Sequence, residues 1–339
     1  MSKTIRTLFL GDLVGRPGRE AVEKFLREEV SKTDFAKSDD DADVSCCVLN
    51  AAKSDTKPYA KPYDFIIANV ENASHGFGLT KKNHDELHSY GIDCMTSGNH
   101  IWDKKDIYTY IDESEFLIRP YNYHKTARGV GYRIFQNKII VINLLGKTFM
   151  QPVVCPFQAL YDVMSYLNTE VGLEDKIVIA DFHAEATAEK ICFANFAYSL
   201  GVSAVFGTHT HVQTADERLI TEGFELSSDF NCFPKADETD TAKNADAVIK
   251  NAFDDFKPKK SMAYITDAGF CGSFDSIIGM EYERSLKRLV TSIPERFDVA
   301  VSKTRQINAV CVEFDFETGC ALEIKRINFN YKNDEEKVQ

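Results

Sequence analysis

The segments KIVIADFH (residues 176–183) and VSAVFGTHTH (residues 202–211) decide the fold, because each is an apolar, strand-like run that ends in histidine. Three upstream strand-like segments end in acidic or amide side chains in the same way. If the five strands lie in one sheet, their polar ends can meet at its carboxyl edge, where α/β proteins build their sites. Carboxylates, amides and imidazoles together are the ligand set of a two-metal hydrolytic centre. The five clusters are Gly11-Asp12, Glu71-Asn72, Gly98-Asn99-His100, Asp181-Phe182-His183 and Thr208-His209-Thr210-His211.

Strand-like and helix-like segments alternate along most of the chain. This order predicts a mainly parallel sheet covered by helices, while two predicted hairpins add antiparallel strands. A layered α/β domain with mixed sheets satisfies both patterns. The predicted strands are Thr4–Leu10, Asp64–Val70, Asp93–Thr96, Lys176–Ala180, Val202–Phe206 and Met262–Thr266, and the predicted helices are Arg19–Val30, Lys82–Tyr90, Pro156–Asn168 and Glu185–Leu200. The predicted hairpins pair Tyr132–Phe135 with Ile139–Leu144 and Ala309–Phe316 with Ala321–Ile327.

The length of 339 residues fits one large α/β domain with insertions. We expect this domain to span residues 1–329 and to be followed by a polar tail at 330–339. Two polar, acidic stretches, at about 31–62 and 226–260, have the composition of surface insertions. The second of them contains a predicted helix at Ala245–Phe256.

Composition narrows the class of protein. A hydrophobic content of 44% and a charged content of 27% are typical of a globular protein with a sizeable core. No stretch approaches the roughly 18 apolar residues that span a bilayer, and no signal peptide is recognisable, so we expect a cytoplasmic protein without membrane contact. The net charge of −12 argues against strong binding to long nucleic acid but not against a small nucleotide. The nine scattered cysteines, without a CxxC pair, disfavour a thiolate zinc site.

Oxygen ligands for two cations come from four positions. Two neighbouring divalent cations need a shared anionic ligand, and Glu71 fits because it leaves a strand in an apolar context. Asp12 could be a terminal ligand, and Asn72 and Asn99 could supply amide oxygens. Each position also has an ordinary structural interpretation. Glu71 could cap a helix N-terminus, and the other three could be turn residues.

Three histidines complete the predicted ligand set. His209 and His211 are two residues apart, so on an extended backbone they would point the same way and could bind one metal each or share one. His183 ends a strand of its own. Each could be a surface histidine when taken singly, but ligand chemistry at all five strand ends is improbable by accident. Mixed imidazole and oxygen ligation suits iron or manganese.

His100 is expected to differ from the other three, because it follows the potential ligand Asn99 and can face the substrate. A histidine in that place could protonate a leaving alkoxide. Asp103, one helical turn later, could orient its ring. Ordinary structural roles are expected for the remaining histidines, which are His75, His84, His88 and His124.

At these residues the chain resembles the calcineurin-like metallophosphoesterases, specifically the YmdB-like family of bacterial phosphodiesterases. The order and context of the motifs match over nearly the whole chain outside the two insertions. The matching segments are Phe9-Leu10-Gly11-Asp12-Leu13-Val14-Gly15, Val70-Glu71-Asn72-Ala73, Gly98-Asn99-His100-Ile101-Trp102-Asp103, Asp181-Phe182-His183-Ala184-Glu185-Ala186-Thr187, the run from Gly207 to Arg218, Tyr264-Ile265-Thr266-Asp267 with Gly269, and Asp275-Ser276-Ile277-Ile278-Gly279.

The resemblance implies a four-layer α-β-β-α sandwich with two mixed sheets, the metallo-dependent phosphatase fold. It also implies two divalent metal ions, iron or manganese, and hydrolysis of 2′,3′-cyclic nucleotides with His100 as the proton donor. By the family's pattern one metal would be held by Asp12, Glu71, Asn72 and His211, and the other by Glu71, Asn99, His183 and His209, with Glu71 bridging.

The chain departs from the wider superfamily at Val14. The first motif usually reads Asp-x-His, whereas here it is Asp12-Leu13-Val14. The missing imidazole would leave the first metal weakly held, and Asn72 could replace it. We therefore expect this metal to be the easier one to lose.

The leading hypothesis is hydrolysis of a cyclic nucleotide by a metal-bridging hydroxide, while His100 protonates the departing ribose oxygen. A metal-dependent phosphomonoesterase or nucleotidase is the alternative, because the centre alone does not set the substrate class. A nucleotide-binding regulatory protein with little turnover is a third hypothesis, since fold does not fix function. The expected partners are a small nucleotide phosphodiester and, in a homo-oligomer, further copies of the chain.

Overall fold

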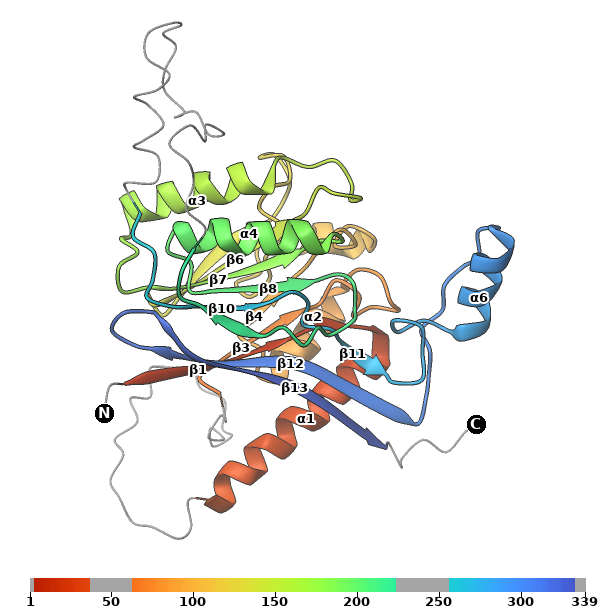
Figure 1. Ribbon diagram of the computed structural model, residues 1–339. Helices are drawn as coiled ribbons and strands as arrows, with labels where there is room; N and C mark the ends of the chain where they lie inside the picture. The colour runs from red at the N-terminus through yellow and green to blue at the C-terminus, as the bar shows by residue number, and fades with distance from the viewer. Residues whose placement is uncertain (1–2, 37–62, 224–255, 333–339) are drawn as a thin grey trace, which may run out of the picture.

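The structure, a computed structural model, describes residues 3–36, 63–223 and 256–332. In these ranges two mixed β-sheets pack face to face and helices cover both outer faces, as Figure 1 shows. The first sheet contains β1 (Thr4–Leu10), β2 (Asp12–Leu13), β3 (Phe65–Asn69), β4 (Cys94–Thr96), β11 (Phe270–Ser273), β12 (Thr304–Asp315) and β13 (Ala321–Lys332). The second contains β5 (Tyr132–Phe135), β6 (Ile139–Leu145), β7 (Ile177–His183), β8 (Ala204–Thr208), β9 (Arg218–Ile220) and β10 (Met262–Ile265).

Each sheet has a parallel part that carries the site and antiparallel strands beside it. In the first sheet the order is β2-β11-β12-β1-β3-β4, with β13 paired to β12, and β1, β3 and β4 run parallel. In the second the order is β5-β6-β7-β8-β10-β9, and β6, β7, β8 and β10 run parallel. The carboxyl ends of the parallel strands therefore lie together at one edge of each sheet.

The core between the sheets is made of the inward-facing apolar side chains of both. Phe9 of β1 and Phe206 of β8 meet there with their ring centroids 4.7 Å apart. Both rings are fully buried, and burial of such a side chain stabilises a fold by about 1.5–3 kcal/mol. This contact fixes the distance between the two strands whose ends carry Asp12 and His209.

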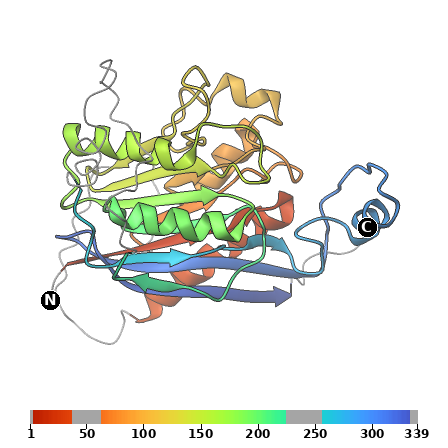
Figure 2. The same cartoon turned by 45° about the horizontal axis from the view of Figure 1, so that its top comes forward.

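Helices form the two outer layers, which are also visible in Figure 2. α3 (Pro156–Glu170) and α4 (Thr187–Ser199) lie on the second sheet, where Phe193 stacks on Phe182 at 3.9 Å between centroids. α1 (Gly15–Ala36) and α2 (Lys81–Ser89) share a hydrophobic cluster with the outer face of the first sheet. The predicted four-layer α-β-β-α sandwich is confirmed.

One helix stands apart from these layers. α6 (Tyr282–Thr291) projects from the body of the molecule in both views. Its apolar side chains are largely exposed, for example Leu289 at 78% and Val290 at 75%. A short 3-10 helix, η1 (Lys105–Thr109), follows the Asn99-His100 segment. No helix among the described residues is long and apolar enough to cross a membrane.

The predicted elements agree with the structure at most positions. Both predicted hairpins form, as β5–β6 and β12–β13, and the second is longer than expected, so that β13 extends to Lys332 past the predicted start of the tail. α1 begins at Gly15, earlier than the predicted Arg19. The short strands β2, β9 and β11 and helix α6 were not predicted. Most of the two polar stretches, with nearly all of the helix predicted at Ala245–Phe256, lies outside the described residues.

Candidate metal centre

The five polar clusters meet where the carboxyl edges of the two sheets adjoin. The five strands do not share one sheet, the condition first considered, but are divided between two, as the resemblance implied. Three clusters come from the first sheet and two from the second, because the apolar inner faces pack together and bring the two edges side by side. Asp12 lies in β2, Glu71 and Asn72 follow β3, Asn99 and His100 follow β4, His183 ends β7, and His209 and His211 follow β8. All of the predicted site residues are thus brought to this one edge. We call Asp12, Glu71, Asn72, Asn99, His183, His209 and His211 the metal edge.

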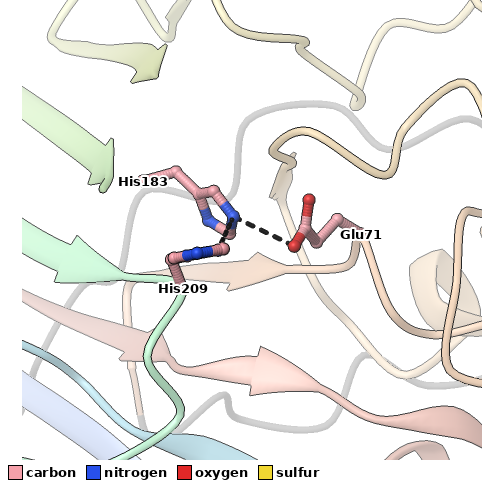
Figure 3. A group of neighbouring side chains, drawn as sticks. All are labelled: Glu71, His183 and His209. Atoms are coloured by element: carbon pink, nitrogen blue, oxygen red, sulfur yellow. Dashed lines mark hydrogen bonds and ion pairs between the residues drawn. The ribbon is translucent and has the colours of Figure 1, made fainter. Parts of the chain in front are cut away.

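His183 is the point on which the first group of donors converges. Its Nε2 lies 3.0 Å from Glu71 Oε1, 3.1 Å from His209 Nδ1 and 3.2 Å from Asn99 Oδ1. Figure 3 shows Glu71 and the two imidazoles directed at one another. A single ring nitrogen forms only one hydrogen bond, so it cannot satisfy three polar atoms. The donor atoms of Glu71, His183 and His209 all lie within 4.8 Å of one another, a spacing suited to one cation.

The contacts of Nδ1, the second ring nitrogen of His183, decide which tautomer the ring adopts. Thr208 Oγ1 donates to Asp181 Oδ1 at 2.7 Å and lies 2.9 Å from His183 Nδ1. Because the hydroxyl proton is already used, Thr208 Oγ1 accepts a hydrogen bond from Nδ1–H of His183. The Nε2 lone pair of His183 therefore faces the other donors. Lone pairs in such close contact repel unless a cation or a proton lies between them.

The other two imidazoles are oriented in the same manner. His209 Nε2 lies 3.1 Å from Glu185 Oε2, which leaves Nδ1 to face His183. His211 Nδ1 donates to the carbonyl of Ile278 at 2.9 Å, which leaves Nε2 at 3.8 Å from Asp12 Oδ1. Each ring thus holds one N–H away from the centre and presents one lone pair to it, the usual arrangement of metal-binding histidines.

His209 and His211 do not lie on an extended backbone, so the expectation that they point the same way is wrong. Their φ angles are 94° and 61°, in the left-handed region that non-glycine residues rarely adopt. The segment is held by Asp267 Oδ2, which accepts hydrogen bonds from the amide and hydroxyl of Thr210 and from Lys190 Nζ. His209 consequently faces His183, whereas His211 faces Asp12.

Two buried oxygens support a second cation beside His211. Asp12 Oδ1 and Asn72 Oδ1 have no hydrogen-bond partner within the described ranges. Asn72 Nδ2 donates to the carbonyl of Gly76 at 2.9 Å, which fixes the orientation of the amide and leaves its oxygen unpaired. A buried oxygen without a partner costs about 1–3 kcal/mol, which a bound cation would offset. These residues fit the group that the resemblance implies.

The charges of the centre reinforce this fit. Burial raises the pKa of Asp12, although His211 and His183 act in the opposite direction. Burial would lower the pKa of His183, but the carboxylates of Glu71, Asp12 and Asp181 outweigh it and raise the pKa. The same negative field that raises the pKa of His183 would attract a divalent cation, whose binding competes with protonation of the ring.

Gly98 lets these groups come together. A Cβ at this position would lie 2.3 Å from Glu71 Oε2 and 2.4 Å from His183 Nε2. No side chain can be accommodated at that distance without moving both donors. A glycine next to Asn99 is therefore a steric requirement of the centre.

His100 lies beside the centre rather than in it. Its backbone amide donates to Glu71 Oε2 at 2.9 Å, and its Nδ1 lies 2.8 Å from Asp103 Oδ2. Its ring packs edge-on against Phe77, with centroids 4.9 Å apart. The contact with Asp103 is the one anticipated from the sequence, and it leaves Nε2 available. The role of the pair in catalysis stays a prediction.

Val14 fills the place where the wider superfamily has a histidine. It is fully buried in a small cluster with Phe270 and Met280. The cluster supports the loop at 277–280, whose Ile278 carbonyl accepts the hydrogen bond from His211. An apolar side chain thus replaces a ligand and helps to orient another one.

Sequence reasoning missed the residues that hold the ligands in place. Asp181 accepts hydrogen bonds from Asn69, Thr96 and Thr208, and all four side chains are buried. A usable signal was present: Asp181 and Thr208 each stand next to or near a predicted ligand in a short polar cluster. At these strand ends a polar side chain is as typical of a turn as of a ligand support, so the pattern alone does not assign them.

A fold of two mixed sheets in four layers, with this donor set at their shared edge, defines the metallophosphoesterase class, and the comparisons with known proteins agree. The family model described as "YmdB-like protein" matches residues 48–238 and 244–327. The chain therefore belongs to the YmdB-like family, and it is a phosphoesterase.

Individual relatives support this assignment over nearly the full length. The chain is 34% identical over 329 residues to a 2′,3′-cyclic-nucleotide 2′-phosphodiesterase of Bacillus subtilis, covering 96% of this chain and 97% of the relative. A crystal structure of a novel phosphatase from Mycoplasma pneumoniae matches with a TM-score of 0.71 at 27% identity, covering 98% and 96% of the two chains. A hypothetical protein from Thermus thermophilus matches with a TM-score of 0.67 at 28% identity, covering 96% and 99%.

Proposed function

We propose that this chain is a dinuclear metal-dependent phosphodiesterase that hydrolyses 2′,3′-cyclic nucleoside monophosphates. The observation that carries the proposal is the convergence of Glu71, His183 and His209 on one point, next to two unpaired buried oxygens. One cation would be held by Asp12, Glu71, Asn72 and His211, and the other by Glu71, Asn99, His183 and His209. When bound, two such cations activate water as a nucleophile and neutralise charge on a phosphoryl group.

The donor set favours iron or manganese. It combines imidazole nitrogens with carboxylate and amide oxygens and includes no thiolate, a mixture that suits these ions. Among the described cysteines, the buried ones take part in core packing or lie outside the centre. Metal analysis of protein purified without oxygen tests this assignment.

His100 is the proposed proton donor. Asp103 lies 2.8 Å from its Nδ1 and fixes the ring, so that Nε2 can carry the proton to the departing ribose oxygen. The amide of the same residue anchors Glu71, so the position of the acid is tied to the metal edge. The backbone anchor survives side-chain truncation, and His100→Ala should therefore keep its metals.

The choice of substrate rests on the relative from Bacillus subtilis, whose name specifies a 2′,3′-cyclic nucleotide. The two sheets and the metal edge do not distinguish a cyclic diester from a monoester. A panel of 2′,3′-cyclic, 3′,5′-cyclic and linear diesters beside nucleoside monophosphates separates the phosphodiesterase from the phosphomonoesterase. Faster turnover of monoesters would overturn the proposed substrate class.

The decisive experiment compares His100→Ala with a matched control, His124→Ala, an exposed histidine whose Nδ1 lies 2.8 Å from Oγ1 of the neighbouring Thr126. General acid catalysis contributes about 10²–10⁴-fold, so His100→Ala should lose that much turnover of 2′,3′-cyclic AMP while retaining its metal content. His124→Ala should keep both. Unchanged turnover in His100→Ala would remove the assigned role. Stoichiometric binding of cyclic nucleotide without hydrolysis by the wild type would instead indicate a regulatory protein.

We further propose that the chain acts in the cytoplasm, on a small nucleotide and not on a long nucleic acid. The net charge of −12 supports this choice of substrate, because a polyanion would be repelled. Assembly into a homo-oligomer is tested by light scattering of the full chain. The organisation as one domain over residues 1–329 is tested by limited proteolysis.

A further inference from the structure

A cavity of about 370 Å³ opens beside the metal edge and has two chemically different ends. Glu71, His209 and His211 form one end, together with His100. The other end is apolar and carries one arginine. We call Phe77, Ile277, Ile278, Met280, Arg288 and Phe297 the cavity wall. The volume falls within the range of about 300–1,000 Å³ of pockets that enclose a small ligand.

We propose that the cavity wall is a nucleobase site in which Arg288 recognises guanine in preference to adenine. This inference rests on the proposed function, since it assigns the base of the same substrate. A nucleotide has an anionic phosphate at one end and a flat, largely apolar base at the other. The cavity has the same two-ended character, with a cation-binding edge facing the phosphate and apolar side chains facing the base.

Two apolar side chains of the wall are exposed to solvent at a cost. Ile277 is 39% and Ile278 is 47% exposed, although water disfavours such surfaces. Ile278 also has a φ of 47°, which a β-branched residue rarely adopts. Strain of this kind persists only where the surroundings enforce it, and it concentrates at ligand sites. The loop is enforced by His211, which bonds to the Ile278 carbonyl, so one strained turn links the metal edge to the cavity wall.

The position of Arg288 allows its guanidinium to bind a planar ligand. Its guanidinium carbon lies 4.7 Å from the centroid of the Phe297 ring, so the two flat groups support each other. The neighbouring Arg284 is paired with Asp298 at 2.8 Å, and Lys287 is paired with Glu295. Arg288, by contrast, has no ion pair with a carboxylate in the part of the chain that the structure describes. A cation left unpaired in a chain of net charge −12 retains its hydrogen-bonding capacity for a ligand.

The chemistry of arginine selects among the bases. The guanidinium offers only donors in a fixed fork, and guanine presents two acceptors, O6 and N7, at the matching spacing. Adenine presents one acceptor and one donor on the same edge, so its amino group, a donor, would face an N–H donor of the guanidinium. Uracil has no adjacent pair of acceptors, because its O2 and O4 flank the N3–H donor. Cytosine presents O2 and N3 side by side, so the discrimination by Arg288 is drawn against adenine and not against cytosine. The apolar side chains contribute a contact surface that every base can use, and Arg288 adds the discrimination.

A second phosphate is the competing ligand for an arginine, and the surroundings favour the base. A phosphate at the cavity wall would lose its hydration against Ile277, Ile278 and Met280 without a second cation to compensate. A base loses little by the same contact, because its faces are apolar. The substitution Arg288→Lys separates the two cases. Lysine keeps the charge that a phosphate needs but lacks the fork that guanine needs.

The test measures kcat/KM of the metal-loaded full chain for the four 2′,3′-cyclic nucleotides and for base-free ribose 2′,3′-cyclic phosphate. Wild type should prefer cyclic GMP over cyclic AMP by about tenfold, the order of one bidentate arginine–base contact. Arg288→Met and Arg288→Lys should both abolish this preference. The matched control Arg284→Met, on the same helix, should retain it. Equal kcat/KM for cyclic GMP and cyclic AMP in wild type, or a preference preserved in Arg288→Lys, would overturn the proposal.

A binding measurement that needs no turnover keeps the two proposals separate. Guanosine and adenosine, which lack a phosphate, are titrated against wild type and Arg288→Lys by ligand-detected NMR. Guanosine should bind more tightly than adenosine to wild type and equally to the variant. If no diester is hydrolysed but guanosine is still preferred, the proposed function fails and the base site stands. If diesters are hydrolysed without any base preference, the base site fails alone.

Discussion

The metal edge and the cavity wall adjoin each other but are built in opposite ways. Five of the seven residues of the metal edge are buried, Asn99 and His209 are half-buried, and each imidazole is fixed by a polar contact with a neighbouring group. The cavity wall is partly exposed and draws on the projecting helix α6 and on a strained loop. The predicted metal ligands, which require a precise geometry, thus lie at strand ends. The residues proposed to determine substrate specificity lie nearer the surface. The difference predicts that substitutions at the metal edge will be severe and that those at the wall will be selective.

The largest effect is expected from Glu71→Gln. This change removes the negative charge that would offset the two proposed cations, and both metals should be lost together. Turnover should fall by more than about 10³-fold, because even the loss of an outer partner of a ligand costs about 10–100-fold. Metal content by plasma mass spectrometry, measured beside turnover, checks the expectation. A variant that keeps two metals per chain would show that Glu71 does not bridge them.

A smaller loss is expected from Thr208→Val, which deletes the hydroxyl between Asp181 and His183. His183 would no longer be held in one tautomer, and metal affinity should fall by about 10–100-fold. Asn69 and Thr96 still bond Asp181, so the fold should survive. Thr208→Ser retains the hydroxyl and should restore the affinity. Equal metal affinity in the valine and serine variants would refute the role of the hydroxyl.

Gly279→Ala probes the turn that connects the two regions. Gly279 has a φ of 98°, and a Cβ there would lie 2.5 Å from Val14 Cγ1. Backbone strain and overpacking should lower the free energy of unfolding by about 1–3 kcal/mol and displace Ile278 from His211. The metal held by Asp12 and His211 should then be lost first. Urea unfolding and metal analysis test this, and adding Val14→Ala should recover part of the stability.

The smallest change in stability is expected from Ile278→Asn, because asparagine tolerates the φ of 47° better than isoleucine does. The free energy of unfolding should stay within about 1 kcal/mol of wild type, while KM for cyclic nucleotides rises as the cavity wall loses apolar surface. Urea unfolding and steady-state kinetics measure the two quantities. A loss of more than about 2 kcal/mol, with KM unchanged, would place this residue in the core and not in the ligand site.

Much of the fold could be predicted because strand patterns are local. The predicted strand Thr4–Leu10 and the hairpin strand Tyr132–Phe135 match β1 and β5 at both ends. Two-residue strands such as β2 carry too few side chains for a pattern, and they form only because β11 pairs with them. α6 has little contact with the body and leaves its apolar side chains exposed. Apolar residues at helical spacing usually form a buried face, and in α6 they do not.

The candidate site could be predicted in its members but not in its geometry. Every predicted ligand reaches the metal edge, whereas the predicted extended backbone at His209 and His211 is wrong. The segment is held by Asp267, which is distant in sequence, accepts hydrogen bonds from Thr210 and is itself paired with Lys190. The arginine of the cavity wall was not singled out at all, because a single arginine in a helix carries no motif.

The sequence by itself determined the inventory of donors, since the chemistry of a side chain and its place at the end of a strand are local properties. It also determined the absence of an imidazole at Val14. Only the tertiary structure decided which nitrogen of each histidine faces the centre, because contacts with Thr208, Glu185 and Ile278 orient the rings. Tertiary packing likewise decided that the donors come from two sheets and that an apolar cavity lies beside them. Both depend on contacts between segments that the order of residues alone does not bring together.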